Sequence, residues 1–124
     1  MQTVLTASAF DRQARAAKLS EDEVAMMAAA TGSAPTSGDL IPGTGGARKL
    51  RFPWPGAGKS GGFRTIHYFG GEDVSVFLLA LVDKGQRANL SKAERNELAD
   101  VLPRIAEAYR AGVARRVVEM KGKP

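Results

Sequence analysis

Cysteine is absent from this chain of 124 residues, and histidine occurs only once. A disulfide framework and a cysteine-ligated metal site are therefore excluded, and a single histidine cannot form a zinc-binding cluster. No run approaches the roughly 18 apolar residues that span a bilayer, and the first ten residues lack the basic start and apolar core of a signal peptide. We therefore expect a soluble cytoplasmic protein without a membrane partner, a metal or a cofactor.

Acidic residues are missing from one long segment. Five basic residues and no acidic residue lie between Leu40 and Gly71, namely Arg48, Lys49, Arg51, Lys59 and Arg64. The tail from Arg110 onwards adds five basic residues against one glutamate, so these two segments hold the positive excess of a chain whose net charge is +5. Such clustering is typical of a surface that binds a polyanion. A solvated basic surface is the alternative interpretation.

The first part of the sequence predicts a short strand over 2–6 and then two helices. Ser20 and Glu23 form a capping box at the start of the second helix, and Gly32 can end it. Residues 33–46 have no apolar period and predict an irregular connection. Three strands then follow in close order, over residues 47–54, 63–69 and 74–82. The last of these is almost continuously apolar, which is typical of a strand in the middle of a sheet.

The last helix begins with a second capping box, formed by Ser91 and Glu94. Pro103 falls inside the apolar stripe of this helix, where it is expected to kink or restart it. We therefore predict one α+β domain over residues 1–112, with two N-terminal helices packed on a small, mainly antiparallel sheet and a C-terminal helix. Residues 113–124 form a basic tail that is either disordered or docked on a partner.

The stretch "PWPGAGKS", residues 53–60, comes close to the phosphate-binding pattern G-x-x-x-x-G-K-[ST]. Pro53 stands where that pattern needs its first glycine, and Pro55 removes a second backbone donor. A strand follows this stretch, whereas a phosphate loop enters a helix. We therefore predict a glycine-rich hairpin loop that carries Lys59 at its tip.

The two strands joined by this loop bring basic side chains together. Lys49 and Arg51 share one strand face and are expected near Arg64 across the ladder, where like charges cost stability. Such a cluster is better explained by an anionic ligand, because cations can neutralise the charge of a phosphodiester transition state. A metal-dependent nuclease would need grouped carboxylates, which this region lacks. His67 is expected on the opposite face, as a packed or partly exposed side chain.

Two aromatic residues lie beside the same loop. Trp54 and Tyr68 could stack on nucleic-acid bases, although lone aromatics beside a hairpin more often anchor the core or the loop.

The run "GDLIPGTGGARKLRF", followed by "GKSGGFRTIHYF" and "FLLALVDKGQRANLS", resembles the RelE/ParE superfamily of toxins from type II toxin–antitoxin systems. The similarity is strongest to its HigB-like branch and covers residues 38–100 best. The resemblance implies a RelE-like α+β fold and a metal-independent endoribonuclease that cleaves mRNA in the ribosomal A site, by attack of the ribose 2′-hydroxyl. It also implies translation inhibition, silenced by a cognate antitoxin, which would be a small helix-turn-helix protein.

Site residues can be carried over from the resemblance by position. Lys49 and Arg51 match the two basic residues of the second family strand, one a candidate base and the other a phosphate ligand. Arg64 matches a transition-state stabiliser, and Lys84 matches the lysine after the last strand of HigB-like members. Arg48, Lys59, Tyr68 and Arg87 complete the set as expected nucleic-acid contacts.

The sequence also departs from the family pattern. Gly85 replaces an arginine, Val82 replaces a frequent tyrosine, and no tyrosine stands near Leu90, so the general acid and base are not assigned. Two other functions therefore stay open. One is a ParE-like toxin that inhibits DNA gyrase without cutting RNA, and the other is a non-catalytic RNA-binding domain.

Overall fold

The computed structural model describes residues 2–52, 62–83 and 90–122, without the side chains of Asp83 and residues 113–122. The elements are, in chain order, β1 (Val4–Thr6), α1 (Ser8–Ala16), α2 (Glu21–Ser33), β2 (Asp39–Leu40), β3 (Ala47–Phe52), β4 (Phe63–Tyr68), β5 (Val76–Asp83) and α3 (Lys92–Gly122). The five strands form one sheet in the order β1-β5-β4-β3-β2. Only the β1–β5 pair among them is parallel. The predicted α+β class with a mainly antiparallel sheet is confirmed.

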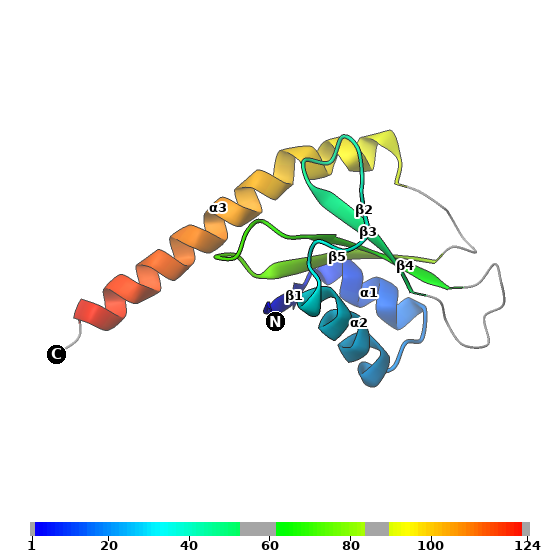
Figure 1. Cartoon of the computed structure of the whole chain (residues 1–124), viewed down its shortest axis with the longest axis horizontal. Coiled ribbons are helices and arrows are strands. Elements are labelled where there is room, and N and C mark those ends of the chain that lie inside the picture. The colour runs from blue at the N-terminus through cyan, green and yellow to red at the C-terminus, as the bar shows by residue number, and fades with distance from the viewer. Residues whose placement is uncertain (1, 53–61, 84–89, 123–124) are drawn as a thin grey trace.

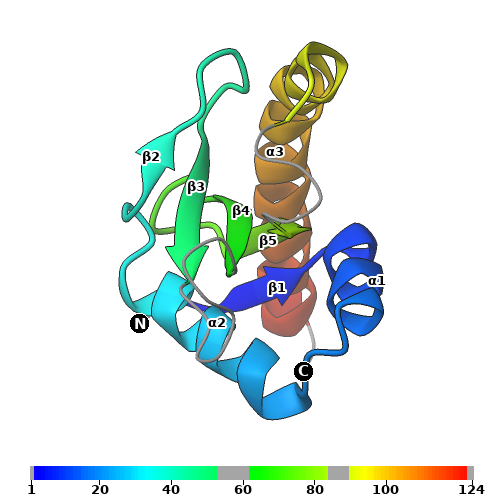
Figure 2. The same ribbon diagram turned by 90° about the vertical axis from the view of Figure 1, so that its right-hand side faces the viewer.

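The helices cover the two faces of the sheet from opposite sides. Helices α1 and α2 lie on one face, and α3 crosses the other and continues beyond the sheet (Figures 1 and 2). Phe10, Met27 and Leu78 are central to the core beneath α1 and α2. Ile66 and Leu102 are central to a second core beneath α3. The chain therefore folds into three layers with a core on each side of the sheet.

Helix α2 begins where the sequence predicts. The Ser20 hydroxyl accepts a hydrogen bond from the Glu23 backbone N–H (3.1 Å), and the Glu23 carboxylate accepts one from the Ser20 N–H (2.8 Å). These two bonds satisfy donors that a helix N-terminus leaves unpaired. The cap fixes the phase of the helix, which buries Met27 completely and leaves the adjacent Met26 half-exposed.

At the edge of the sheet next to β3, the structure differs from one expectation drawn from the sequence. Residues 33–46 are not wholly irregular, because Asp39 and Leu40 form β2, which pairs antiparallel with β3. The Thr44 hydroxyl donates to the Ile41 carbonyl (2.7 Å) and accepts from the Ala47 N–H (3.0 Å), which holds the connection between the two strands in place. A two-residue strand is too short for any periodic pattern to reveal it.

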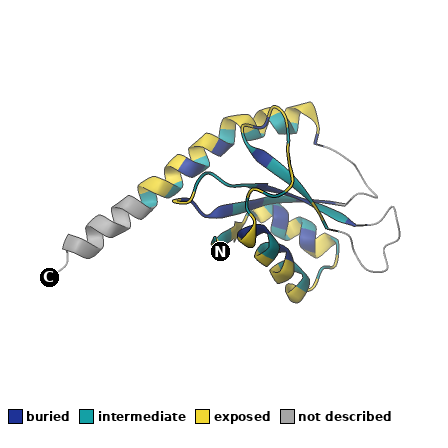
Figure 3. Cartoon of the chain, viewed as in Figure 1, coloured by how far each residue is buried: buried dark blue, intermediate teal, exposed yellow. Residues whose placement is uncertain are grey.

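Strand β5 lies inside the sheet, between β1 and β4, although the middle position belongs to β4. The parallel pairing with β1 covers only Val76–Leu78. Farther along the strand, the Leu81 N–H donates to the side-chain oxygen of Gln13 in α1 (2.7 Å). An amide of α1 thus satisfies a backbone donor on β5 beyond the reach of β1. Figure 3 shows how much of this inner strand is buried.

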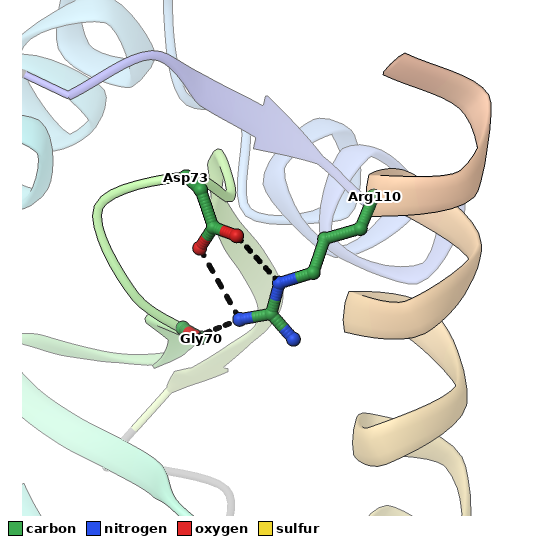
Figure 4. Close-up of polar contacts among 3 residues, drawn as sticks. All are labelled: Gly70, Asp73 and Arg110. Carbon is green, nitrogen blue, oxygen red and sulfur yellow. Dashed lines mark hydrogen bonds and ion pairs between the residues drawn. The ribbon is translucent and has the colours of Figure 1, made fainter. Parts of the chain in front are cut away.

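Helix α3 is a single helix through Pro103, so it does not restart there, and its backbone stays helical to Gly122. Its outer part is fastened to the β4–β5 turn by Arg110, which donates to both Asp73 carboxylate oxygens (2.7 and 3.2 Å) and to the Gly70 carbonyl (2.8 Å; Figure 4). Tyr109 adds an edge-on contact with Phe77. Within the described residues, no helix is long and apolar enough to cross a membrane.

Candidate nucleic-acid interface

The centre of the basic surface is a pair of arginines on adjacent strands. Arg51 of β3 stands directly opposite Arg64 of β4 in the antiparallel ladder. Side chains in such a pair leave the same face of the sheet, with their Cβ atoms about 5 Å apart. Arg51 is exposed and Arg64 is half-buried. The predicted proximity of these two cations is therefore confirmed at the level of strand register.

Lys49 lies two residues before Arg51 and shares its face of the sheet. Its cross-strand neighbours are Ile66 on β4 and Asp39 on β2. Ile66 belongs to the core beneath α3, so the three cations occupy the α3 side of the sheet. We call Lys49, Arg51 and Arg64 the cation cluster. It lies on the same face of the sheet as the core beneath α3 and extends from that core towards the β3–β4 loop.

An open pocket of about 590 Å³ adjoins the cation cluster. Its lining combines side chains from the β2–β3 edge, from β5 and from the start of α3: Asp39, Leu40, Ile41, Pro42, Gly43, Lys49, Val82, Leu90, Lys92, Arg95 and Asn96. Lys49 is common to the cluster and the pocket, and Val82 stands opposite Arg64 across the β4–β5 ladder. The cluster and the pocket therefore form one continuous site.

Two glycines of the sequence motif lie in the segment that provides one wall of this pocket. Gly38 has a φ of +85°, and a Cβ atom there would collide with the Lys49 carbonyl oxygen. Gly45 has a φ of +77° and lies against α3, where a Cβ would stand 3.6 Å from the Cα atom of Ala99. Both positions favour glycine because L-residues rarely adopt this backbone conformation. The run "GDLIPGTGG" accordingly allows close backbone approach to β3 at Gly38 and a left-handed backbone at both positions.

The opposite wall is the first part of α3. The Ser91 hydroxyl accepts from the Glu94 N–H (3.1 Å), and the Glu94 carboxylate accepts from the Ser91 N–H (2.9 Å). This capping box was predicted, and it fixes where the next side chains point. Arg95 is held by a hydrogen bond from its guanidinium to the Leu90 carbonyl (3.0 Å). Lys92 and Arg95 thus bring two further cations to the pocket, at the helix end whose dipole favours anions.

Among the remaining expected site residues, Arg48 and Tyr68 do not join the cluster. Arg48 points to the other face of the sheet, and its guanidinium donates to the Gly38 carbonyl (3.3 Å). Tyr68 shares the face of the cluster but lies at the far end of β4, where its ring packs against Gly46 and Gly70. Lys59, Lys84 and Arg87 lie outside the described residues. The role of each of these five residues stays a prediction.

His67 lies on the far face of the sheet, as expected from its spacing to Arg64. Its side chain is fully buried, and its Nε2 atom is 2.9 Å from the Pro35 carbonyl oxygen, to which it can donate. Burial lowers the pKa of His67, with a smaller contribution from Arg48 in the same direction. The neutral imidazole therefore connects the α2–β2 segment to the sheet and takes no part in the interface.

Sequence reasoning missed four polar residues of the pocket. Asp39, Lys92, Arg95 and Asn96 lie in two segments whose summed charge is negative, so segment charges gave no reason to select them. The signal that could have found three of them is the Ser91–Glu94 capping box, which places residues 92–96 in the first turns of a helix. What the sequence could not indicate was that these turns face Lys49.

Phosphate recognition without a metal is the chemistry that this arrangement can support best. Among the described residues, no three His, Cys, Asp or Glu side chains are grouped so that they could hold a metal ion. The cations instead surround an open surface that can take a charged chain. Fold and site together define a small α+β protein with a cluster of cations on one face of its sheet.

The family follows from the comparison with known proteins. Residues 2–121 match the family described as the RelE toxin of the RelE / RelB toxin-antitoxin system. This match spans nearly the whole chain, so the chain belongs to the RelE toxin family and is a toxin of a toxin–antitoxin system. A cognate antitoxin partner follows from that membership. The narrower placement in a HigB-like branch stays a prediction.

Proposed function

We propose that this toxin is a ribosome-dependent mRNA endoribonuclease that inhibits translation, acting in the cytoplasm. The observation that carries the proposal is the Arg51–Arg64 pair, two like charges directly opposite each other on an accessible part of the sheet, with Lys49 beside them. An anion that binds between the two arginines would offset the repulsion of like charges that stand opposite each other. A phosphodiester at this position would meet three cations.

The proposed reaction is attack of a ribose 2′-hydroxyl on the adjacent phosphorus. The O–P bond that forms closes a 2′,3′-cyclic phosphate, and the bond to the 5′-oxygen of the next nucleotide breaks. The attacking hydroxyl loses a proton and the departing oxygen gains one. Arg51 and Arg64 stabilise the additional negative charge of the pentavalent transition state, for which the planar guanidinium with its paired donors is well suited.

Lys49 is the better candidate for the base, because an arginine stays protonated in proteins whereas a lysine can release its proton. Its position between the pocket and the rest of the cluster would bring it close to the ribose of a nucleotide bound there. A cognate antitoxin, expected to be a small helix-turn-helix protein, would silence the activity by covering this face.

The test is cleavage of mRNA on translating ribosomes, with the 5′ ends of the products mapped. Arg51→Ala and Arg64→Ala are expected to lower the cleavage rate by about 100- to 1000-fold, the effect of losing one transition-state donor. Arg12→Ala is the matched control, since it removes one exposed cation from α1 on the far side of the sheet and should leave cleavage unchanged. Unfolding curves of all three variants identify any loss of cleavage that is caused by misfolding.

Three outcomes would overturn the proposal. Intact message at stoichiometric wild-type protein would exclude the nuclease. Inhibited DNA supercoiling by gyrase, together with intact message, would instead support the ParE-like alternative. Salt-sensitive RNA binding without products would leave a non-catalytic RNA-binding domain.

A further inference from the structure

The pocket beside the cation cluster has two chemically different parts. Apolar side chains line it from both walls, namely Leu40, Ile41, Pro42, Val82 and Leu90. Its polar groups are the cations Lys49, Lys92 and Arg95, the Asn96 amide and the Asp39 carboxylate. A flat aromatic ring with polar edges fits such a lining better than a bare phosphate does. At about 590 Å³, the pocket falls in the range of small-ligand sites.

Asp39 is the unexpected member of this lining. Among the described residues that line the pocket, it is the acidic one, in surroundings that otherwise attract anions. Its register opposite Lys49 places both side chains on the α3 face of the sheet. A carboxylate there repels phosphate, so it would weaken a site that bound only phosphates. It is useful if the ligand also presents hydrogen-bond donors.

The position of the pocket relative to the cluster suits one nucleotide of a single-stranded RNA. Lys49 and Arg51 are two residues apart along β3, which corresponds to about 7 Å. A phosphate held by Arg51 and Arg64 would thus have its neighbouring sugar at Lys49 and the attached base in the pocket. Single-stranded RNA is commonly recognised in this way, through unstacked bases that are hydrogen-bonded along their Watson–Crick edges.

We infer that the pocket binds the base next to the scissile phosphate and that Asp39 makes guanine the preferred base. This inference rests on the proposed nuclease function. An ionised carboxylate only accepts hydrogen bonds, and guanine presents two adjacent donors, N1–H and the N2 amino group, on its Watson–Crick edge. Adenine, cytosine and uracil each place an acceptor beside their donor. Lys92 and Arg95 hold the adjoining backbone, and Asn96 completes the polar rim.

The first measurement is the base preference at the mapped cleavage sites on ribosome-bound mRNA. Wild-type protein is expected to cut next to guanine. Asp39→Asn should still cut, but its preference for guanine should be about 10-fold lower, since one bidentate base contact gives discrimination of this order. Asp22→Asn is the matched control, because it removes one exposed carboxylate from α2 on the far side of the sheet. It should leave the preference unchanged.

The second measurement separates this inference from the nuclease proposal. Binding of RNA heptamers of the form U3-X-U3 to the free protein is measured by fluorescence anisotropy, with X as guanine, adenine or cytosine. Guanine should bind about 10-fold more tightly than the others, and Asp39→Asn should remove the difference. Guanine-selective binding without cleavage would sustain the pocket and reject the nuclease.

Other results would overturn the inference. Equal binding of the three heptamers, together with cleavage that ignores the base, would show that Asp39 does not select the base. Complete loss of cleavage in a folded Asp39→Asn variant, at guanine and at other bases alike, would assign Asp39 to the chemical step instead of base selection.

Discussion

The two faces of the sheet differ in how far their cover extends. Beneath α1 and α2, side chains such as Phe10, Met27 and Leu78 have no exposed surface. Beneath α3, Ile66 and Leu102 are buried as completely, but towards the β3–β4 loop the same face carries the half-buried Arg64 and the exposed Arg51. The side chains named on the first face are fully packed, whereas the second face changes from packed side chains to accessible cations along one pair of strands.

The largest expected change in stability concerns the face of the sheet beneath α1 and α2. Met27→Ala should lower the free energy of unfolding by about 2–5 kcal/mol, since it removes a completely buried side chain and leaves a cavity. The neighbouring Met26 is 53% exposed, so Met26→Ala should change stability by no more than about 0.5 kcal/mol. Urea unfolding measures both, and equal losses would contradict the phase of α2 described above.

A smaller change in stability, one that depends on pH, is expected from His67 on the same face of the sheet. Because burial lowers its folded pKa below the usual 6.5, the unfolded chain takes up a proton first as the pH falls. Stability should therefore be complete above about pH 6.5 and decline below it, with a slope of at most about 1.4 kcal/mol per pH unit for one proton. The chain has no other histidine, so few other groups titrate there.

The variant His67→Gln provides the control for this pH dependence. Its amide can still donate to the Pro35 carbonyl but takes up no proton, so its urea midpoints at pH 7.5 and pH 5.5 should agree more closely than those of the wild type. A wild-type midpoint that stays constant between these two pH values would show that protonation of His67 is not opposed by the fold.

The smallest expected change in stability concerns the cation cluster, where a substitution should stabilise the fold instead of destabilising it. Arg51→Ala should leave the free energy of unfolding unchanged or raise it by about 0.2–1 kcal/mol, because it relieves the repulsion from Arg64. Low-salt urea unfolding, compared with Arg12→Ala, measures this difference. Marked destabilisation would mean that Arg51 serves the fold, and the contrast between the two faces would fail.

Local patterns predicted much of the fold. Both capping boxes form as expected, since a Ser followed three residues later by Glu contains all the atoms of the motif. Alternation along β3 placed Lys49 and Arg51 on one face, because side-chain direction in a strand depends only on residue parity. These features are encoded within a few neighbouring residues.

Features that depend on contacts between distant segments were either not predicted from the sequence or predicted only in part. The strand β2 lies beside β3 because Thr44 holds the turn between them and Gly38 leaves room for the close approach to Lys49, and its two residues carry no pattern of their own. The pocket was missed because it forms only when the start of α3 packs across the sheet from Asp39. Pro103 was expected to kink or restart a helix that continues through it.

The pairing of the first strand with the last has a consequence for how the protein is made. Val4 is synthesised early, but its partner Val76 follows only after most of the sheet, and the α3 wall of the pocket comes later still. Chains emerge from the ribosome N-terminus first, and contacts between distant residues form slowly because a long loop must close. A nascent chain therefore has no complete site until synthesis has passed Asn96.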